Sequence, residues 1–149
     1  MGGLSLDRWY YDACVLDKSK SAYAEMFNRH YPIKAVISHL ALGEAFANSH
    51  RRGNEVADAF MSLVRDLSPY IEIVGNDGCD AILHDVKREF QHLSITDALH
   101  VATAIKNNCV NLRTIDRDLY GIPQRKKLQE IGVKFGLRSF SITKMVFRS

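Results

Sequence analysis

The chain has 149 residues, of which 46% are hydrophobic and 25% are charged. This length and composition fit a single globular domain over residues 1–149 and exclude a largely disordered chain. No apolar run approaches the roughly 18 residues of a membrane-spanning helix, and the first residues lack the pattern of a secretory signal. We therefore expect a cytoplasmic protein that makes no contact with membranes.

The three cysteines, Cys14, Cys79 and Cys109, are odd in number and far apart in the sequence. No two of them have the C-x-x-C spacing of a redox motif or a zinc site. We expect reduced cysteines in the core rather than a disulfide framework.

The formal net charge of +3 hides an uneven distribution. Residues 1–100 contain 10 Lys and Arg against 14 Asp and Glu, whereas residues 101–149 contain 10 against 3. Arg125, Lys126 and Lys127 form a basic cluster in this last third. Such a cluster is often an ordinary solvated surface, but it also carries the charge that a nucleic-acid backbone attracts. These three residues are therefore candidate nucleic-acid-binding residues.

Hydrophobic patterning predicts strands that alternate with helices along the chain. A first strand, in RWYYDACVL, ends near Asp12. Further strands are expected in YPIKAVISHL after Pro32, YIEIV, VNLRTID and, as the fifth, GVKF at 132–135. Helices are expected at 19–30, 39–51, 54–67, 79–91 and from 94 to 107 or 108. The tail SFSITKMVFRS, residues 139–149, is either a last strand or a surface for a partner. Strands separated by helices favour a parallel sheet with helices on both faces.

Acidic residues fall where such a sheet presents its ligand-binding edge. Asp12 ends the first strand, Asp116 follows the fourth, and Asp97 lies at the start of a helix. In open parallel sheets, ligands bind beyond the carboxyl ends of the strands. Glu44, about two turns into the helix after the second strand, is placed to reach the same edge. Four converging carboxylates repel one another unless a cation lies among them, and oxygen ligands without His or Cys suit Mg²⁺ or Mn²⁺.

Asp97 also has a purely structural explanation. Ser94 and Asp97 form an S-x-x-D pattern before the apolar run of SITDALHVATA, which is typical of a helix capping box. Because the other acids are expected at the same edge of the sheet, we predict that Asp97 both caps the helix and binds metal. His100 shares the helix face of Asp97, and we expect a hydrogen-bonded packing residue there rather than one that orients the acids. Ser38 is expected to cap a helix and to lie near the acidic edge.

Four motifs of this chain, YYDACVL, ISHLALGEA, SITDALHVATA and LRTIDRDL, resemble the acidic motifs of PIN-domain ribonucleases, especially the VapC-like toxins of toxin–antitoxin pairs. The resemblance runs from residue 10 to residue 119. It implies an α/β fold, a three-layer α/β/α sandwich with a central parallel sheet of about five strands. It also implies that a divalent metal, Mg²⁺ or Mn²⁺, is bound by Asp12, Glu44, Asp97 and Asp116.

The resemblance assigns further roles. Thr114 matches a hydroxyl residue that orients a carboxylate, and Asp118 matches a frequent extra acid. The implied activity is hydrolysis of RNA phosphodiester bonds, with Arg125, Lys126 and Lys127 holding the RNA backbone. The implied partner is a cognate antitoxin protein, and the apolar helices DAFMSLV and CDAILHDV are candidate surfaces for it or for a homodimer. Departures from the family pattern at Ala13, Cys14, Arg113 and Leu119 remove no implied ligand.

Two alternatives share the fold: a housekeeping PIN ribonuclease in RNA processing, and a catalytically inactive PIN module that binds RNA or protein and needs no metal. A phosphatase of the HAD type is disfavoured, because Ala13 and Cys14 follow Asp12 and leave no D-x-D at the first strand. A receiver domain is disfavoured because it requires an acidic pair at that strand.

Overall fold

The computed structural model describes residues 6–18 and 33–145. Its strands are β1 (Asp7–Tyr11), β2 (Ile33–Ser38), β3 (Ile71–Val74), β4 (Asn111–Thr114) and β5 (Ser141–Lys144). Its helices are α1 (Ala13–Lys18), α3 (His39–Arg51), α4 (Asn54–Leu67), α5 (Asp80–Glu89), α6 (Ile95–Lys106), α7 (Arg117–Tyr120) and α8 (Arg125–Lys134). The helix predicted over residues 19–30 lies outside the described residues.

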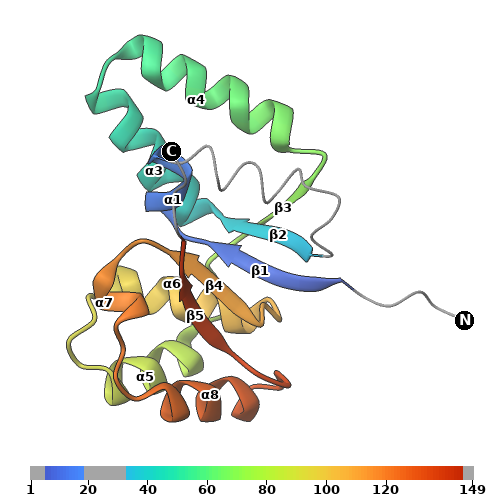
Figure 1. The fold of residues 1–149 in the computed structure, drawn as a ribbon, viewed down its shortest axis with the longest axis vertical. Coiled ribbons are helices and arrows are strands. Elements are labelled where there is room, and N and C mark those ends of the chain that lie inside the picture. The colour runs from blue at the N-terminus through green and yellow to red at the C-terminus, as the bar shows by residue number, and fades with distance from the viewer. Residues whose placement is uncertain (1–5, 19–32, 146–149) are drawn as a thin grey trace, which may run out of the picture.

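The five strands form one parallel sheet in the order β3-β2-β1-β4-β5 (Figure 1). β1 lies at the centre, where Tyr10 aligns with Val36 of β2 on one side and with Leu112 of β4 on the other. All three side chains are fully buried, as expected for a parallel sheet that is covered on both faces. The predicted parallel sheet of about five strands is therefore confirmed.

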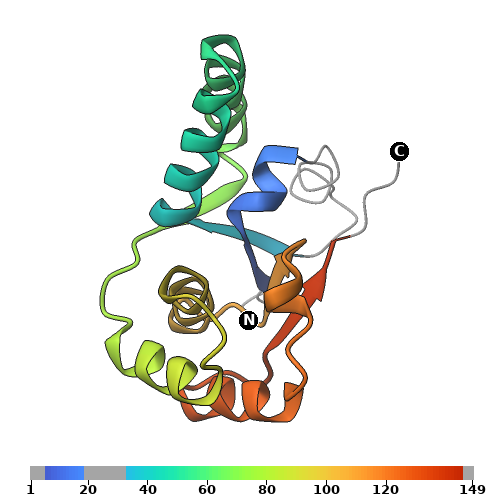
Figure 2. The same cartoon turned by 90° about the vertical axis from the view of Figure 1, so that its left-hand side faces the viewer.

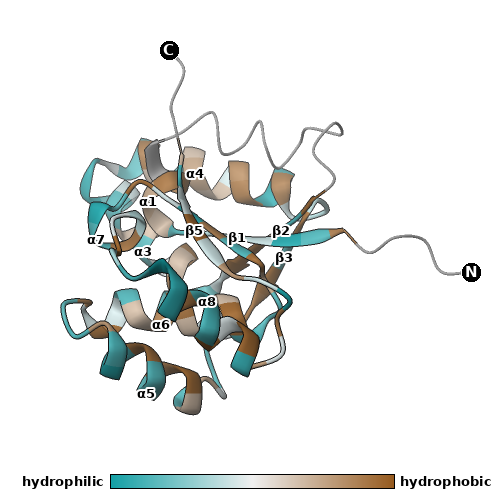
Figure 3. Cartoon of the chain, turned by 60° about the horizontal axis from the view of Figure 1, so that its bottom comes forward, coloured by the Kyte–Doolittle hydropathy of each residue, from teal (hydrophilic) through white to brown (hydrophobic). Residues whose placement is uncertain are grey.

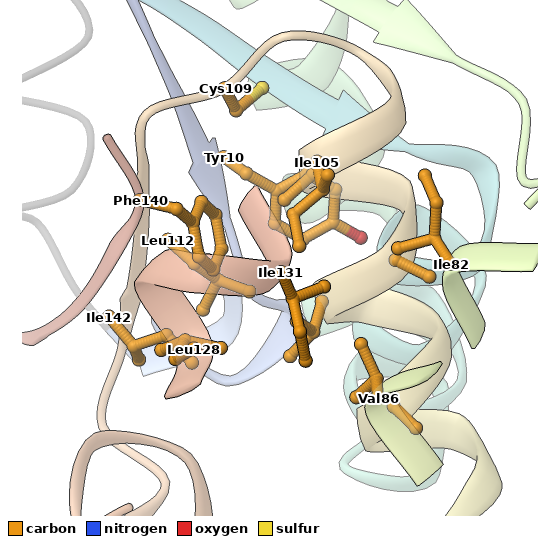
Figure 4. Packing of buried hydrophobic residues seen from close by; sticks show 14 of the residues in the cluster. Tyr10, Ile82, Val86, Ile105, Cys109, Leu112, Leu128, Ile131, Phe140 and Ile142 are labelled. Atoms are coloured by element: carbon orange, nitrogen blue, oxygen red, sulfur yellow. The ribbon is translucent and has the colours of Figure 1, made fainter. Parts of the chain in front are cut away.

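Each face of the sheet has its own hydrophobic core, because successive side chains of a strand point to opposite faces. Tyr10 packs in the core that includes α5, α6 and α8, whereas Tyr11 packs in the core that includes α1, α3 and α4. Figure 4 shows the first core, where Ile82 and Val86 of α5 lie near Ile131 of α8. Figure 2 shows α1, in blue, and α6, in olive, on opposite sides of the sheet. This is the α/β/α sandwich expected from the sequence.

One predicted strand is wrong. The stretch GVKF was expected to form the fifth strand, but it begins inside α8 and only Phe135 lies beyond the helix. The fifth strand is β5, which lies in the tail and confirms one of the two alternatives for that segment. Gly132 lies inside α8, and its lack of a side chain lets the helix approach the following loop closely: a Cβ atom at this position would lie 2.6 Å from Cβ of Phe140. The glycine therefore marks close packing and not the end of a helix.

Helices α3 and α4 form a hairpin that projects from the sheet (Figures 1 and 2). As predicted, Ser38 caps α3, since its hydroxyl accepts a hydrogen bond of 3.1 Å from the amide of Ala41. Hydrophobic residues recur along α4 (Figure 3), and Met61 remains exposed. In contrast, α5 buries Ile82 and Val86 in the core, so these apolar side chains of CDAILHDV are not exposed to a partner.

Two smaller expectations concern the cysteines and membranes. Cys79 and Cys109 are buried and Cys14 is half-buried, and all three are free thiols. Within residues 6–18 and 33–145, no helix has the length and apolar character needed to cross a membrane.

Candidate active site

The topology of the sheet creates a crevice between β1 and β4. From β1 the chain builds β2 and β3 on one side, and later adds β4 and β5 on the other side. Where the order reverses in this way, the connections that leave two neighbouring strands diverge and open a crevice at their carboxyl ends. Asp12 directly follows β1, and Asp116 follows β4 after a single residue. The fold therefore brings these two predicted acids to the same crevice.

Thr114, the last residue of β4, links the two acids. Its hydroxyl donates to Oδ2 of Asp12 at 2.9 Å and accepts a hydrogen bond of 2.9 Å from the amide of Asp116. The other oxygen of Asp12, Oδ1, accepts from the amide of Ala13 at 2.8 Å. Because Thr114 is fully buried, its hydroxyl holds both acidic residues in a fixed relation. The role predicted for Thr114, orienting a carboxylate, requires a hydroxyl contact of this kind.

Asp97, Asp116 and Asp118 form the tightest carboxylate group among the described residues. Each contributes one oxygen, and these oxygens lie within 4.8 Å of one another. Ser94 caps α6, because its hydroxyl accepts a hydrogen bond of 3.0 Å from the amide of Asp97. Asp116 caps α7 in the same manner, through the amide of Asp118 at 2.9 Å. Burial, followed by the charges of Asp116 and Asp12, raises the pKa of Asp97 above its ordinary value.

Glu44 and Asp12 meet at a buried histidine. His100 is 1% exposed, and its Nε2 lies 2.6 Å from Oε1 of Glu44 and 3.5 Å from Oδ1 of Asp12. Its Nδ1 lies 2.6 Å from the hydroxyl of Tyr10, which in turn lies 2.7 Å from Oγ of Ser38. The expectation of a hydrogen-bonded packing histidine is confirmed, but its partners also place it against two of the predicted acids.

Burial would by itself lower the pKa of His100, because a buried imidazolium loses its hydration. The hydrogen bond to Glu44 and the negative charges of Asp12, Glu44 and Asp97 outweigh this effect and raise the pKa above its ordinary value. The neighbouring carboxylates thus favour the protonated form of His100.

The chemistry of the donor set fits a hard divalent cation. The group of Asp97, Asp116 and Asp118 contains only carboxylate oxygens, which suit Mg²⁺ and Mn²⁺ better than thiolate-preferring metals. Cys14 lies nearby, with Sγ 3.2 Å from Oδ2 of Asp12. Burial, followed by the charge of Asp12, raises the pKa of this thiol to about 12, so it stays protonated and donates to the carboxylate.

The structure thus divides the predicted acids into two neighbouring sets. Asp97 and Asp116 lie together with Asp118, which the sequence suggested only as a supporting acid. Asp12 and Glu44 lie on His100. Ser38, also predicted as a supporting residue, reaches this region only through Tyr10.

Sequence reasoning missed Tyr10, although a signal was available. Tyr10 and Asp12 are two residues apart at the end of a strand, and such residues point to the same face. It also missed the basic residues that adjoin the carboxylates, His92 and Arg117. The predicted basic cluster is exposed on the first turn of α8, where Nζ of Lys127 lies 3.2 Å from Oε2 of Glu89.

The fold and its acidic crevice define a class of α/β protein with carboxylates at the topological switch point. The PIN domain family matches residues 12–124, a span that contains all the acids described above. The chain therefore belongs to the PIN domain family, as the sequence motifs suggested. No curated protein sequence matches the chain with significance.

Solved structures share the fold at low sequence identity. VapBC2 from Rickettsia felis, bound to a DNA fragment from its promoter, matches with a TM-score of 0.63 and 13% identity over 93% of this chain and 99% of the other. VapC20 from Mycobacterium tuberculosis, a toxin that cleaves the sarcin-ricin loop, matches with a TM-score of 0.54 and 19% identity over 74% of this chain and 91% of the other. PAE2754 from Pyrobaculum aerophilum matches with a TM-score of 0.56 and 19% identity over 95% of this chain and 92% of the other.

Proposed function

We propose that the chain is a divalent-metal-dependent endoribonuclease and that it acts as the toxin of a toxin–antitoxin pair. The observation that carries the nuclease activity is the carboxylate group of Asp97, Asp116 and Asp118, set beside Asp12 in the crevice of a PIN-domain fold. The toxin role is supported by the structural similarity to VapBC2 and VapC20.

Asp12, Glu44, Asp97 and Asp116 are the proposed metal ligands, and the position of Asp118 adds it to the same set. When bound, Mg²⁺ or Mn²⁺ would supply electrophilic stabilisation at the scissile phosphate and lower the pKa of water. Thr114 holds Asp12 and Asp116 in a fixed relation, and His100 holds Glu44 beside Asp12. These contacts hold the acids in place before RNA binds, and they oppose the mutual repulsion of the carboxylates.

The proposed RNA contacts include Arg125, Lys126 and Lys127 on the first turn of α8. All three are exposed, and Lys127 is partly neutralised by Glu89. Contacts of this kind bind the phosphate backbone without reading sequence. Replacing all three by Ala should weaken RNA binding and reduce its salt dependence, because fewer counterions are released. An unchanged salt dependence would place the RNA elsewhere on the surface.

A cleavage assay with metal control tests the nuclease proposal. The purified protein should cut single-stranded RNA with Mg²⁺ or Mn²⁺ and lose this activity in EDTA. Asp97→Asn should abolish cleavage and also the rise in melting temperature that Mn²⁺ causes by binding the folded state. Asp66→Asn, which removes an exposed carboxylate from α4, is the matched control and should change neither property.

The outcomes separate the alternatives. Cleavage that persists in EDTA would contradict metal dependence. RNA binding without cleavage, together with no effect of Mn²⁺ on the melting temperature, would favour an inactive RNA-binding module.

A groove between α3 and α4 supports the antitoxin proposal. It has a volume of about 350 Å³ and an entirely apolar lining, formed by Leu42, Gly43, Phe46, Phe60, Met61 and Val64. Phe46 is 40% exposed and Met61 is 44% exposed, so the surface is open to a partner. An amphipathic segment of an antitoxin could bury these side chains, and a basic residue of the same protein could reach the acidic crevice. The predicted homodimer rests on the same exposed apolar surface.

Co-expression tests the toxin role. Growth should stop when this chain is expressed alone and recover when the product of the neighbouring gene is expressed with it. Phe46→Asp should weaken the complex with that product but leave RNA cleavage intact. Equal growth in both cases, with active ribonuclease and no co-purifying protein, would favour a housekeeping ribonuclease. A monomer at all concentrations in light scattering would contradict the homodimer.

A further inference from the structure

The carboxylate group presents an electrostatic problem for an anionic substrate. Asp97, Asp116 and Asp118 repel the phosphates that flank a cleavage position, so positive groups beside the crevice would offset that repulsion. Arg117 lies between two of these acids in the chain, at the start of α7. His92 lies in the connection between α5 and α6, two residues before the Ser94 cap. Both side chains are exposed.

Arg117 and His92 line the same pocket. Its volume is about 400 Å³, and its wall is completed by Asp118, Gly121 and Pro123. The pocket therefore contains one member of the carboxylate group together with two basic residues. A volume of this size lies within the range of sites that bind small molecules.

Contacts within the pocket hold its walls in place. Nε2 of His92 lies 3.3 Å from the backbone oxygen of Asp118, which joins the α5–α6 connection to α7. A Cβ atom at Gly121 would lie 2.6 Å from the backbone oxygen of Arg117 and 3.7 Å from its Cγ. The absence of a side chain at Gly121 therefore leaves room beside the stem of Arg117. Among the residues that the structure describes, no carboxylate forms an ion pair with the guanidinium of Arg117.

We propose that this pocket holds the RNA nucleotide next to the scissile phosphate. Arg117 binds the phosphate of that nucleotide, because a guanidinium offers a planar set of donors that matches phosphate oxygens. His92 stacks on the base, since its ring is exposed and oriented by the contact with Asp118. This inference rests on the proposed ribonuclease function and makes Arg117 and His92 positioning residues for the substrate.

Binding of a labelled single-stranded RNA in EDTA tests the pocket without cleavage. Arg117→Ala should raise the Kd and reduce the slope of log K against log salt by about 0.7, the value for one phosphate contact on a single strand. Arg117→Lys should keep most of that slope, because the positive charge remains. His92→Ala should raise the Kd by about fivefold or more while leaving the slope unchanged, because stacking releases no counterion. Arg65→Ala, an exposed arginine near the end of α4, is the control and should leave the Kd and the slope unchanged.

The results distinguish failure of the pocket from failure of the proposed function. Equal Kd and slope for wild type and Arg117→Ala, or no detectable RNA binding by the wild type, would overturn the pocket. If the wild type cuts RNA with Mn²⁺ and Arg117→Ala binds RNA equally well, only the pocket is wrong. If RNA binding depends on Arg117 but no variant cuts RNA with Mg²⁺ or Mn²⁺, the nuclease proposal fails and the RNA site stands.

Discussion

Nε2 of His100 lies 2.6 Å from Oε1 of Glu44, and this contact joins a buried residue of α6 to a carboxylate of α3. The two residues come from helices on opposite faces of the sheet and meet at its carboxyl edge. Because the same nitrogen lies 3.5 Å from Asp12, the imidazole supports two proposed metal ligands at once. Its other nitrogen is held by Tyr10, which fixes the orientation of the ring.

We expect His100→Ala to lower the affinity for Mn²⁺ by about 10- to 100-fold, because Glu44 and Asp12 lose the group that positions them. Tyr10→Phe keeps the imidazole but removes the hydrogen bond that orients it, so its loss of Mn²⁺ affinity should be smaller than that of His100→Ala. Each variant should reduce the free energy of unfolding by about 1 to 3 kcal/mol, the cost of an unpaired buried polar group. Titration calorimetry and urea unfolding measure the two quantities. Equal Mn²⁺ affinities of the wild type and His100→Ala would contradict the positioning role.

Thr114→Val removes the hydroxyl that joins Asp12 to the amide of Asp116 with little change in shape. We expect about tenfold slower RNA cleavage or more, because the two acids lose their common partner. Thr103→Val is a matched control: its buried hydroxyl accepts a hydrogen bond of 2.9 Å from Asn76, outside the acidic crevice. Both variants should lose about 1 to 3 kcal/mol of stability. If cleavage by the Thr103 variant falls as much as that by the Thr114 variant, the loss reflects stability alone.

Ser94→Ala separates the two roles predicted for Asp97. The variant removes the cap acceptor of α6 and should cost about 1 kcal/mol in the free energy of unfolding. RNA cleavage by the folded protein should remain close to that of the wild type, because all the acids are retained. Thermal unfolding and a cleavage time course provide the comparison with Asp97→Asn. Complete loss of cleavage in Ser94→Ala would mean that the cap itself positions the acids proposed to be catalytic.

Local signals predicted the sheet and the positions of Asp12 and Asp116 well. Both aspartates end short runs of buried strand residues, and the strand–helix alternation fixes which edge of a parallel sheet they share. The cap at Ser94 was also visible, because its hydrogen bond spans only three residues. These features depend on residues that are close together in the chain.

Contacts between distant residues could not be predicted in the same way. Glu44 and His100 are 56 residues apart, and Tyr10 and His100 are 90 residues apart. Their meeting depends on how far each helix is rotated against the sheet, which hydrophobic periodicity does not determine to within a side chain. The pocket of His92 and Arg117 has the same origin, since it forms where two connections meet.

The ion pair of Asp85 and Lys134 predicts a pH dependence of stability. Nζ of Lys134 lies 2.6 Å from Oδ2 of Asp85 and joins α8 to α5. This hydrogen bond lowers the pKa of Asp85 below its ordinary value of 3.8. A depressed pKa in the folded state stabilises the fold above the unfolded pKa and loses that effect as the pH falls through the folded pKa.

Asp85→Asn should therefore cost about 1 kcal/mol near neutral pH, a value typical of a partly exposed pair. The difference between wild type and variant should shrink as the pH falls below 3.8. Urea unfolding at several pH values measures it. A difference that stays constant down to the acid transition would show that the charge of Asp85 contributes nothing.

Gly132 lies in the segment that was wrongly predicted to be a strand. Whether Gly→Ala raises or lowers the stability at this position tests how closely α8 packs. In a helix interior Ala is favoured over Gly by about 1 kcal/mol, so Gly→Ala in an open position should stabilise the protein. Gly43 in α3 is such a position, because a Cβ atom there would meet no other atom within 4 Å. At Gly132, however, the Cβ atom would lie 2.6 Å from Cβ of Phe140, and that atom is attached directly to the backbone and cannot swing away.

We therefore expect Gly43→Ala to stabilise the protein by about 0.5 to 1 kcal/mol and Gly132→Ala to destabilise it by about 1 to 3 kcal/mol, the usual cost of overpacking. Urea unfolding of both variants gives the two changes. Stabilisation by Gly132→Ala would mean that α8 and Phe140 separate easily, and the close approach would then not explain why this helix contains a glycine. Destabilisation by both variants would instead show that the higher helix propensity of Ala is outweighed even at Gly43, the open position in α3.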